Sequence, residues 1–210
     1  AWVNVTYLSA TQDTIIWMKY GNTTCGSQEN IAGTWDGNYV MVQHLNETGN
    51  ILLDSTAYRQ NGTNTGTTFR SSCKIDGGRE YDDDDHITVN NFGGYTNKLT
   101  AEAWVYRDST SIINIFCEGT HYNASDWTLY LRTSNTTAGI DFGTNSHLYY
   151  VRKGSTPVNT WFYLTVVFNA GNTNLYVNST NVGMGSLGST ISNNFTALCL
   201  GNDNDGGQPW

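Results

Sequence analysis

The chain has 210 residues, of which 38% are hydrophobic and only 13% are charged, and its formal net charge is −8. This length is sufficient for the buried core of one main domain. Ten Lys and Arg against 18 Asp and Glu do not supply the basic face that nucleic-acid phosphates require, so we expect no nucleic-acid partner. No apolar run of about 18 residues is present, which argues against insertion into a membrane.

Strand patterns run along the whole chain, and no segment has the composition that helices prefer. Residues 14–20, 38–45 and 86–89 predict strands in the first part, and the polar stretch 54–72 is expected to be a long loop. In the second part, alternating apolar and polar side chains predict strands at residues 99–106, 111–116, 127–132, 147–152, 161–168, 174–178 and 196–200.

Turn-forming residues separate these strands. Residues 134–139, 169–172 and 183–186 combine Gly with Asn or Ser, which turns prefer. Many strands at short spacing are typical of a sandwich or a barrel. We therefore predict an all-β fold, an antiparallel two-sheet β-sandwich.

Several motifs resemble those of a known extracellular family. Residues 99–105, Leu-Thr-Ala-Glu-Ala-Trp-Val, resemble the F-T-I-E-A-W-V strand of laminin-G-like domains. Residues 161–168 and 174–178 are similar to the W-Y-H-V-A-V-T-F and L-Y-V-N-G hairpin of that family. Residues 82–89 resemble its F-D-G-x-D-D-Y-I-x-V strand, although Tyr81 replaces the Phe and the Gly is absent.

Two further motifs precede these in the family's order. Residues 39–47 resemble the opening strand, and residues 54–63 resemble the D-S-S-G-N-x-x-x-G-T loop. From residue 36 to residue 210 the chain thus resembles a laminin-G-like domain of the concanavalin-A-like lectin and glucanase superfamily. The resemblance implies a jelly-roll topology for the sandwich.

The two ends of the chain also bear on its organisation. Residues 1–35 resemble the C-terminal part of a companion β module of microbial surface proteins, on the residues Trp2-Val3-Asn4-Val5 and the run 15–22. Past residue 201 the family continues into a closing strand of the I-D-E-V-R-I type, which we expect this chain to lack. An edge left open is covered either by chain outside this sequence or by neighbouring copies of the chain or other surface proteins.

The chain contains four cysteines, Cys25, Cys73, Cys117 and Cys199, and they form no C-x-x-C pair, which disfavours zinc and redox motifs. An even number fits two disulfides. Bridges of Cys25 with Cys73 and of Cys117 with Cys199 keep each link within one structural unit, whereas four buried free thiols are the alternative.

Eight N-x-S/T sequons predict N-glycosylation, several of them in expected turns where a glycan has room. Their asparagines are Asn4, Asn22, Asn46, Asn61, Asn123, Asn135, Asn178 and Asn194.

Clusters of carboxylates suggest a structural Ca²⁺ ion, which takes oxygen ligands from loops. The runs 82–85 and 202–205 are the most acidic parts of the chain, and the resemblance adds the loop that begins at Asp54. The candidate ligands are Asp54, Asp82, Asp84, Asp203 and Asp205. A solvated acidic loop is the alternative, and no organic cofactor is expected.

Catalysis is not expected. Glycosidases need paired carboxylates on one face around the scissile bond. Glu118 has no carboxylate two or four residues away, and the resemblance gives Glu102 a structural role. The four histidines are scattered, and no nucleophile lies in a recognisable elbow.

Aromatic residues make up 13% of the chain, and sugars stack on exposed rings. The aromatics include Trp104, Trp127, Trp161, Tyr149 and Tyr150, and we expect most of these to belong to the core. A carbohydrate site is therefore expected on ends and loops, at Tyr95, Tyr122, Asn204, Asp205 and Trp210.

These features predict a non-catalytic glycoprotein module outside the cell, on a microbial surface. The weakly charged surface and the open ends favour a structural subunit of a surface layer, sheath or extracellular filament. The superfamily's binding of sugars makes a carbohydrate-binding or adhesion module the alternative, and an accessory domain of a glycoside hydrolase a more remote one.

Overall fold

The computed structural model is nearly all β, with fourteen strands and one short helix, α1 (Ile31–Thr34), among the residues it describes. These are residues 2–82, 84–92, 97–109, 114–118, 129–133, 140–144, 149–153, 156–186 and 197–201. Within these ranges no helix is long and apolar enough to cross a membrane.

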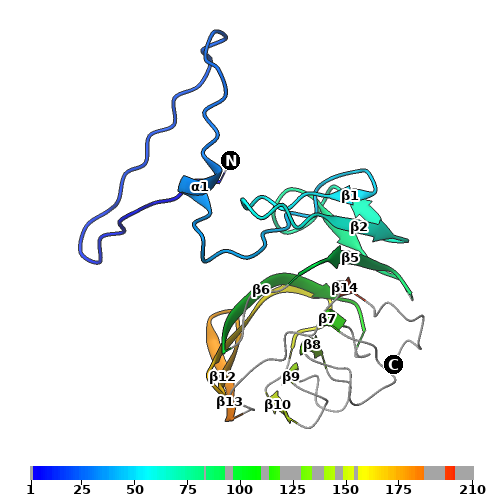
Figure 1. Cartoon of the computed structure of the whole chain (residues 1–210). Helices are drawn as coiled ribbons and strands as arrows, with labels where there is room; N and C mark the ends of the chain where they lie inside the picture. Colours follow the sequence, from blue (N-terminus) through cyan, green and yellow to red (C-terminus); the bar gives the residue numbers. More distant parts are fainter. Residues whose placement is uncertain are drawn as a thin grey trace.

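Two antiparallel sheets form the sandwich (Figure 1). The larger sheet has the strand order β1-β2-β5-β14-β7-β8-β9-β10, and the smaller sheet has the order β13-β12-β11-β6. The strands of the larger sheet are β1 (Ile51–Leu52), β2 (Gly62–Thr65), β5 (His86–Asn90), β14 (Ala197–Gly201), β7 (Asn114–Glu118), β8 (Leu129–Thr133), β9 (Ile140–Thr144) and β10 (Tyr149–Lys153). Those of the smaller sheet are β13 (Thr180–Ser186), β12 (Asn172–Val177), β11 (Thr160–Asn169) and β6 (Lys98–Arg107). A separate hairpin joins β3 (Thr68–Arg70) to β4 (Gly78–Glu80).

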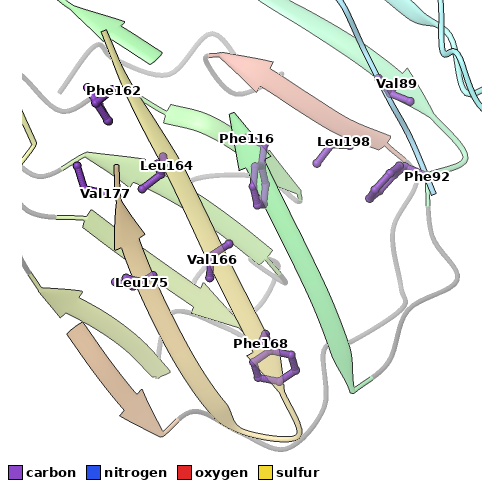
Figure 2. Close-up of a cluster of buried hydrophobic side chains, with 10 residues drawn as sticks. All are labelled: Val89, Phe92, Phe116, Phe162, Leu164, Val166, Phe168, Leu175, Val177 and Leu198. Carbon is purple, nitrogen blue, oxygen red and sulfur yellow. The ribbon is translucent and has the colours of Figure 1, made fainter. Parts of the chain in front are cut away.

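Strict alternation in β11 explains how the sheets pack. Its even-numbered side chains from Phe162 to Phe168 are fully buried, and its odd-numbered ones point away from the core. Figure 2 shows these side chains with Leu175 and Val177 of β12, facing Phe116 and Leu198 of the larger sheet. Each such side chain contributes about 1.5–3 kcal/mol when it is removed from water. The predicted antiparallel two-sheet β-sandwich is confirmed.

Two tight turns connect the strands of the smaller sheet. Ala170 and Gly171 have φ angles of 47° and 95°, and Asn178 and Ser179 have φ angles of 48° and 67°. Two consecutive left-handed residues are the signature of the hairpin turn whose twist matches the flanking strands. The predicted turn at residues 169–172 is therefore confirmed.

Four local predictions are wrong. Residues 14–20 form no strand because, within the described ranges, no partner strand lies beside them; residues 2–30 run as an extended segment outside the sandwich (blue in Figure 1). Residues 38–45 make only one bridge, from Gln43 to Asp54. The expected loop 54–72 contains β2 and β3, and the expected turn 183–186 belongs to β13. In residues 54–72 and 183–186, stretches rich in Thr or Gly form backbone hydrogen bonds with a neighbouring strand. This pairing overrides their local preference for turns.

Candidate functional site

An aromatic face covers the outer surface of the smaller sheet. Trp104 on β6 lies opposite Tyr163 on β11 with ring centroids 5.1 Å apart, and Tyr106 lies opposite Trp161 at 5.6 Å. Because successive side chains of a strand point to opposite faces, these four rings share the face that is turned away from the core. We call Trp104, Tyr106, Trp161 and Tyr163 the aromatic face.

The aromatic face is open to solvent although it is built from large rings. The exposed fractions of Trp104 and Tyr106 are 38% and 47%. The expectation that most of the named strand aromatics belong to the core is therefore wrong for Trp104, while Trp161 is half-buried on the same outward face. The signal was present in the sequence, because Thr100 and Glu102 alternate onto the same face of β6 as Trp104, and both are exposed.

A groove of about 440 Å³ lies at one end of the aromatic face. It is lined by Trp2, Ile75, Trp104, Tyr163, Asn178 and Ser179. These residues come from the N-terminal segment, the β3–β4 loop, strands β6 and β11, and the β12–β13 turn. The volume lies within the range of about 300–1,000 Å³ that small-molecule sites occupy.

Hydrogen bonds fix the floor of the groove. The Tyr163 hydroxyl donates to Glu102 Oε2 over 2.7 Å, and the Tyr163 backbone N–H donates to Asn178 Oδ1 over 2.9 Å. Burial, together with the hydrogen bond to the Glu102 carboxylate, raises the pKa of Tyr163 above its ordinary value. At neutral pH this phenol is therefore a neutral donor with a fixed orientation.

Cationic and aromatic side chains contact two of the lining rings, Trp104 and Trp2. Lys74 Nζ lies 4.6 Å from the centroid of the Trp104 ring, within the range of a cation–π contact. Trp2 stacks on His44 with centroids 4.8 Å apart and planes inclined by 13°. Trp35 packs beside both rings. Burial lowers the pKa of His44, so this imidazole is neutral at neutral pH and holds Trp2 by packing.

Asp54 holds its own loop together in the structure. Its carboxylate is completely buried and accepts hydrogen bonds from the N–H groups of Val42, Thr56 and Gln60, each over 2.9 Å, and from the Thr56 hydroxyl over 2.7 Å. Four protein donors occupy the directions in which a cation would bind. Asp54 therefore organises its own loop and replaces the ladder that residues 38–45 would otherwise form.

The other predicted calcium ligands are only partly covered by the structure. Asp82 and Asp84 lie exposed in the turn before β5, where the Asp82 N–H donates to Asp85 Oδ2 over 3.0 Å. Among the described residues no three His, Cys, Asp or Glu side chains gather in a way that could hold a metal. Asp203 and Asp205 lie outside the described residues, so calcium binding stays a prediction.

The cysteines separate into two pairs of different character. Cys117 on β7 and Cys199 on β14 are partners in the antiparallel register, and both are buried in one small cluster. Such partners have Cα atoms about 4.5–5.5 Å apart, within the range that a disulfide spans. Cys25 is exposed on the N-terminal segment, and no bond joins it to Cys73 of the β3–β4 loop.

The described sequons differ in how their amides are held. The Nδ2 atoms of Asn4 and Asn46 donate to Gly33 O and Asp76 Oδ2 over 2.8 and 3.1 Å. In the other three described sequons the asparagine side chain accepts instead of donating. The Oδ1 atoms of Asn22, Asn61 and Asn178 each accept a hydrogen bond from a backbone N–H. Asn123, Asn135 and Asn194 lie outside the described residues.

None of the residues predicted to bind a ligand is described. Tyr95, Tyr122, Asn204, Asp205 and Trp210 all lie outside the described ranges, as does Trp127. The groove residues were missed because they come together from five separate segments, and no local pattern in the sequence reports such a convergence.

The family comparison covers most of the chain. Residues 76–210 match the model of a family described as the concanavalin A-like lectin/glucanases superfamily. No curated protein is similar to the chain at a significant level.

Solved structures share the fold at low sequence identity. Domain 4 of AbnA, an extracellular arabinanase from Geobacillus stearothermophilus, in complex with arabinotriose, has a TM-score of 0.61 and 16% identity, covering 78% of this chain and 84% of that domain. A sialidase from Trypanosoma rangeli has a TM-score of 0.56 and 11% identity, covering 80% of this chain and 28% of the sialidase. Identities of this order establish the common fold alone.

Proposed function

The chain belongs to the concanavalin A-like lectin/glucanases superfamily, and on this basis we propose that it is a non-catalytic carbohydrate-binding module. The observation that carries the proposal is the aromatic face with the groove at its end. Exposed rings on a rigid sheet offer flat apolar surfaces to the C–H faces of sugars, and they lose little conformational entropy on binding.

The groove combines rings with polar groups in the manner of a sugar site. Trp104 and Tyr163 supply the stacking surface, while Asn178 and Ser179 supply hydrogen-bonding groups at its rim. A sugar presents both an apolar face and a ring of hydroxyls, so a site of this composition satisfies both. The fixed Tyr163 phenol adds an oxygen whose orientation is set before the ligand arrives.

The same groove lacks the chemistry of a glycosidase. Hydrolysis of a glycosidic bond uses two carboxyl groups about 5–10 Å apart on either side of the scissile bond. Among the residues that the structure describes, the six that line the groove include no Asp or Glu. The nearby Glu102 accepts the hydrogen bond of Tyr163 and supports the floor. Binding without hydrolysis is therefore the function that this site favours.

The comparisons support carbohydrate binding more than the structural-subunit role expected from the sequence. The AbnA domain carries arabinotriose in its solved structure and belongs to an extracellular enzyme. A location outside the cell accords with that likeness and with the sequons. No feature of the comparisons favours a surface layer or sheath.

A glycan array probed with the full chain, produced without N-glycans, tests the proposal. We expect binding to a restricted set of oligosaccharides that is lost in Trp104→Ala. Trp17→Ala is the matched control, because Trp17 is also an exposed tryptophan, at 84%, but lies on the N-terminal segment away from the groove. Equal binding by both variants, or no binding by the wild type, would contradict the assignment.

One observation favours assembly as a second candidate function. The N-terminal segment exposes a series of large apolar side chains without a partner strand, namely Val3, Tyr7, Leu8, Ile15, Ile16, Trp17, Met18 and Tyr20. Exposed apolar surface of this extent marks interaction sites. Size-exclusion chromatography with light scattering tests this role: oligomers supported by the segment favour assembly, and a monomer at all concentrations argues against it.

A further inference from the structure

The sequon at residues 178–180 occupies an accessible hairpin tip. β12 ends at Val177 and β13 begins at Thr180, and these two residues are partners in the antiparallel register. Asn178 and Ser179 between them form the two-residue turn, and residues 178–180 are all exposed. A sugar attached at this position would meet no steric obstacle from the strands.

The Asn178 side chain is held in one orientation. Its Oδ1 accepts from the Tyr163 N–H, and its backbone N–H donates to Tyr163 O, both over 2.9 Å. Within the described part of the chain, Nδ2 of this amide makes no hydrogen bond. This distinguishes Asn178 from Asn4 and Asn46, whose Nδ2 atoms already donate to the protein.

Asn178 is also a lining residue of the groove. A glycan linked to its Nδ2 therefore begins at the groove rim, beside Tyr163 and Trp104. Because sugars stack on aromatic rings, and because a groove of about 440 Å³ is of a size that suits small ligands, the attached sugars would fill the same space as an external ligand.

We propose that Asn178 carries an N-linked glycan whose first sugars lie in the groove, so that this modification and the binding of external carbohydrate exclude each other. The second half of the inference rests on the proposed function. In the transfer step, Nδ2 bonds to the anomeric carbon of an oligosaccharide linked to a polyprenyl phosphate. The carbon–oxygen bond to the lipid phosphate breaks, and the amide gives up one proton as the lipid phosphate leaves.

The first test is site occupancy, measured by glycopeptide mass spectrometry on the protein from its natural source or a glycosylating host. We expect Asn178 to be occupied. Thr180→Ala removes the sequon and leaves Asn178 in place, Thr180→Ser retains it, and Thr24→Ala removes a distant sequon on the N-terminal segment. Asn178 found unmodified in the protein from its natural source would overturn the inference.

The second test compares binding to the glycan array and quenching of Trp104 fluorescence by acrylamide, with Trp104→Phe identifying the signal. Thr180→Ala should bind at least about tenfold more tightly than the glycosylated wild type, and its Trp104 should be more accessible, whereas Thr24→Ala should match the wild type. Another outcome is that neither the glycosylated wild type nor Thr180→Ala binds glycans on the array while the quenching of Trp104 still differs between them. That result would support the glycan in the groove and would contradict only the proposed function. Equal quenching and equal binding in an occupied wild type and in Thr180→Ala would overturn the exclusion.

Discussion

The hydroxyl of Tyr163 donates a hydrogen bond to Oε2 of Glu102 over 2.7 Å, linking β11 to the edge strand β6 on the face that is turned away from the core. Through its backbone N–H the same residue holds Asn178, so one tyrosine connects the strands, the turn and the groove. This arrangement explains why a glutamate in a motif strand has a supporting role next to a binding surface.

The alkaline titration of Tyr163 should depend on Glu102. Burial and the hydrogen bond to the carboxylate both raise the pKa of Tyr163, above its ordinary value of about 10. Glu102→Gln should bring this pKa part of the way back, because burial remains. Phenolate absorbance during an alkaline titration measures the effect, and Tyr163→Phe identifies the signal.

The same shift has a consequence for stability. A phenol whose pKa is raised on folding contributes stability that is present below the unfolded value of about 10 and is lost as the pH rises above it. Denaturant unfolding at pH values on both sides of 10 should therefore show a smaller alkaline loss for Tyr163→Phe than for the wild type. An identical pH dependence of the two proteins would refute this reading.

Asp54→Ala should lower the free energy of unfolding by about 3 kcal/mol or more, because four buried donors lose a charged acceptor. Asp54→Asn should lower the free energy of unfolding by less, because the amide keeps one oxygen that can accept hydrogen bonds. Asp36→Asn is the control, because Asp36 is exposed and, within the described part of the chain, its carboxylate accepts a hydrogen bond from the N–H of Asn38 alone. Denaturant unfolding measures all three. Equal stabilities for Asp54→Ala and the control would show that the carboxylate does not organise the loop.

Cys117 and Cys199 should form a disulfide in protein from an oxidising compartment. The bond closes a long loop and should contribute about 4 kcal/mol. Alkylation in denaturant without reductant, followed by peptide mass spectrometry, should leave both thiols unlabelled, and the double change to Ala should lower the melting temperature. Labelled Cys117 and Cys199 in such protein would exclude the bond. The disulfide between Cys25 and Cys73 stays a prediction, and the same alkylation experiment would detect it.

A calcium site at the acidic turn before β5 should make thermal stability depend on the ion. At a calcium concentration about a hundredfold above Kd, the ion stabilises by about 2.7 kcal/mol, which raises the melting temperature by several degrees. Removal with a chelator should reverse this, and Asp82→Asn should abolish it. A melting temperature that is the same with calcium and with chelator would show that these carboxylates bind no calcium and belong to a solvated acidic loop.

The sequence predicted the parts of the fold in which local pattern and tertiary contacts agree. β11 was found because alternation over ten residues has a single interpretation when one face is buried. Residues 14–20 have the same strand composition, but a strand also requires a partner, which the pattern cannot report. Residues 62–65 were assigned to a loop because Asn and Gly dominate the local signal, whereas pairing with β5 decides the outcome.

The candidate site was harder to predict for a related reason. Trp104 was one of the strand aromatics most of which were expected in the core, although its neighbours Thr100 and Glu102 on alternate positions are polar and mark the outer face. Trp2, Ile75 and Asn178 lie far apart in the sequence and meet only through the fold. A carbohydrate site was expected on loops and ends, at residues that lie outside the described ranges, so that expectation stays a prediction.

Calorimetric titration of the best oligosaccharide from the array, into chain that lacks the Asn178 glycan, tests the central claim most directly. We expect Trp104→Ala to lose about 2 kcal/mol of binding free energy, roughly thirtyfold in Kd, while Trp17→Ala stays within about twofold of the wild type. Unchanged affinity in Trp104→Ala, with the variant folded, would show that the aromatic face and its groove do not bind the carbohydrate.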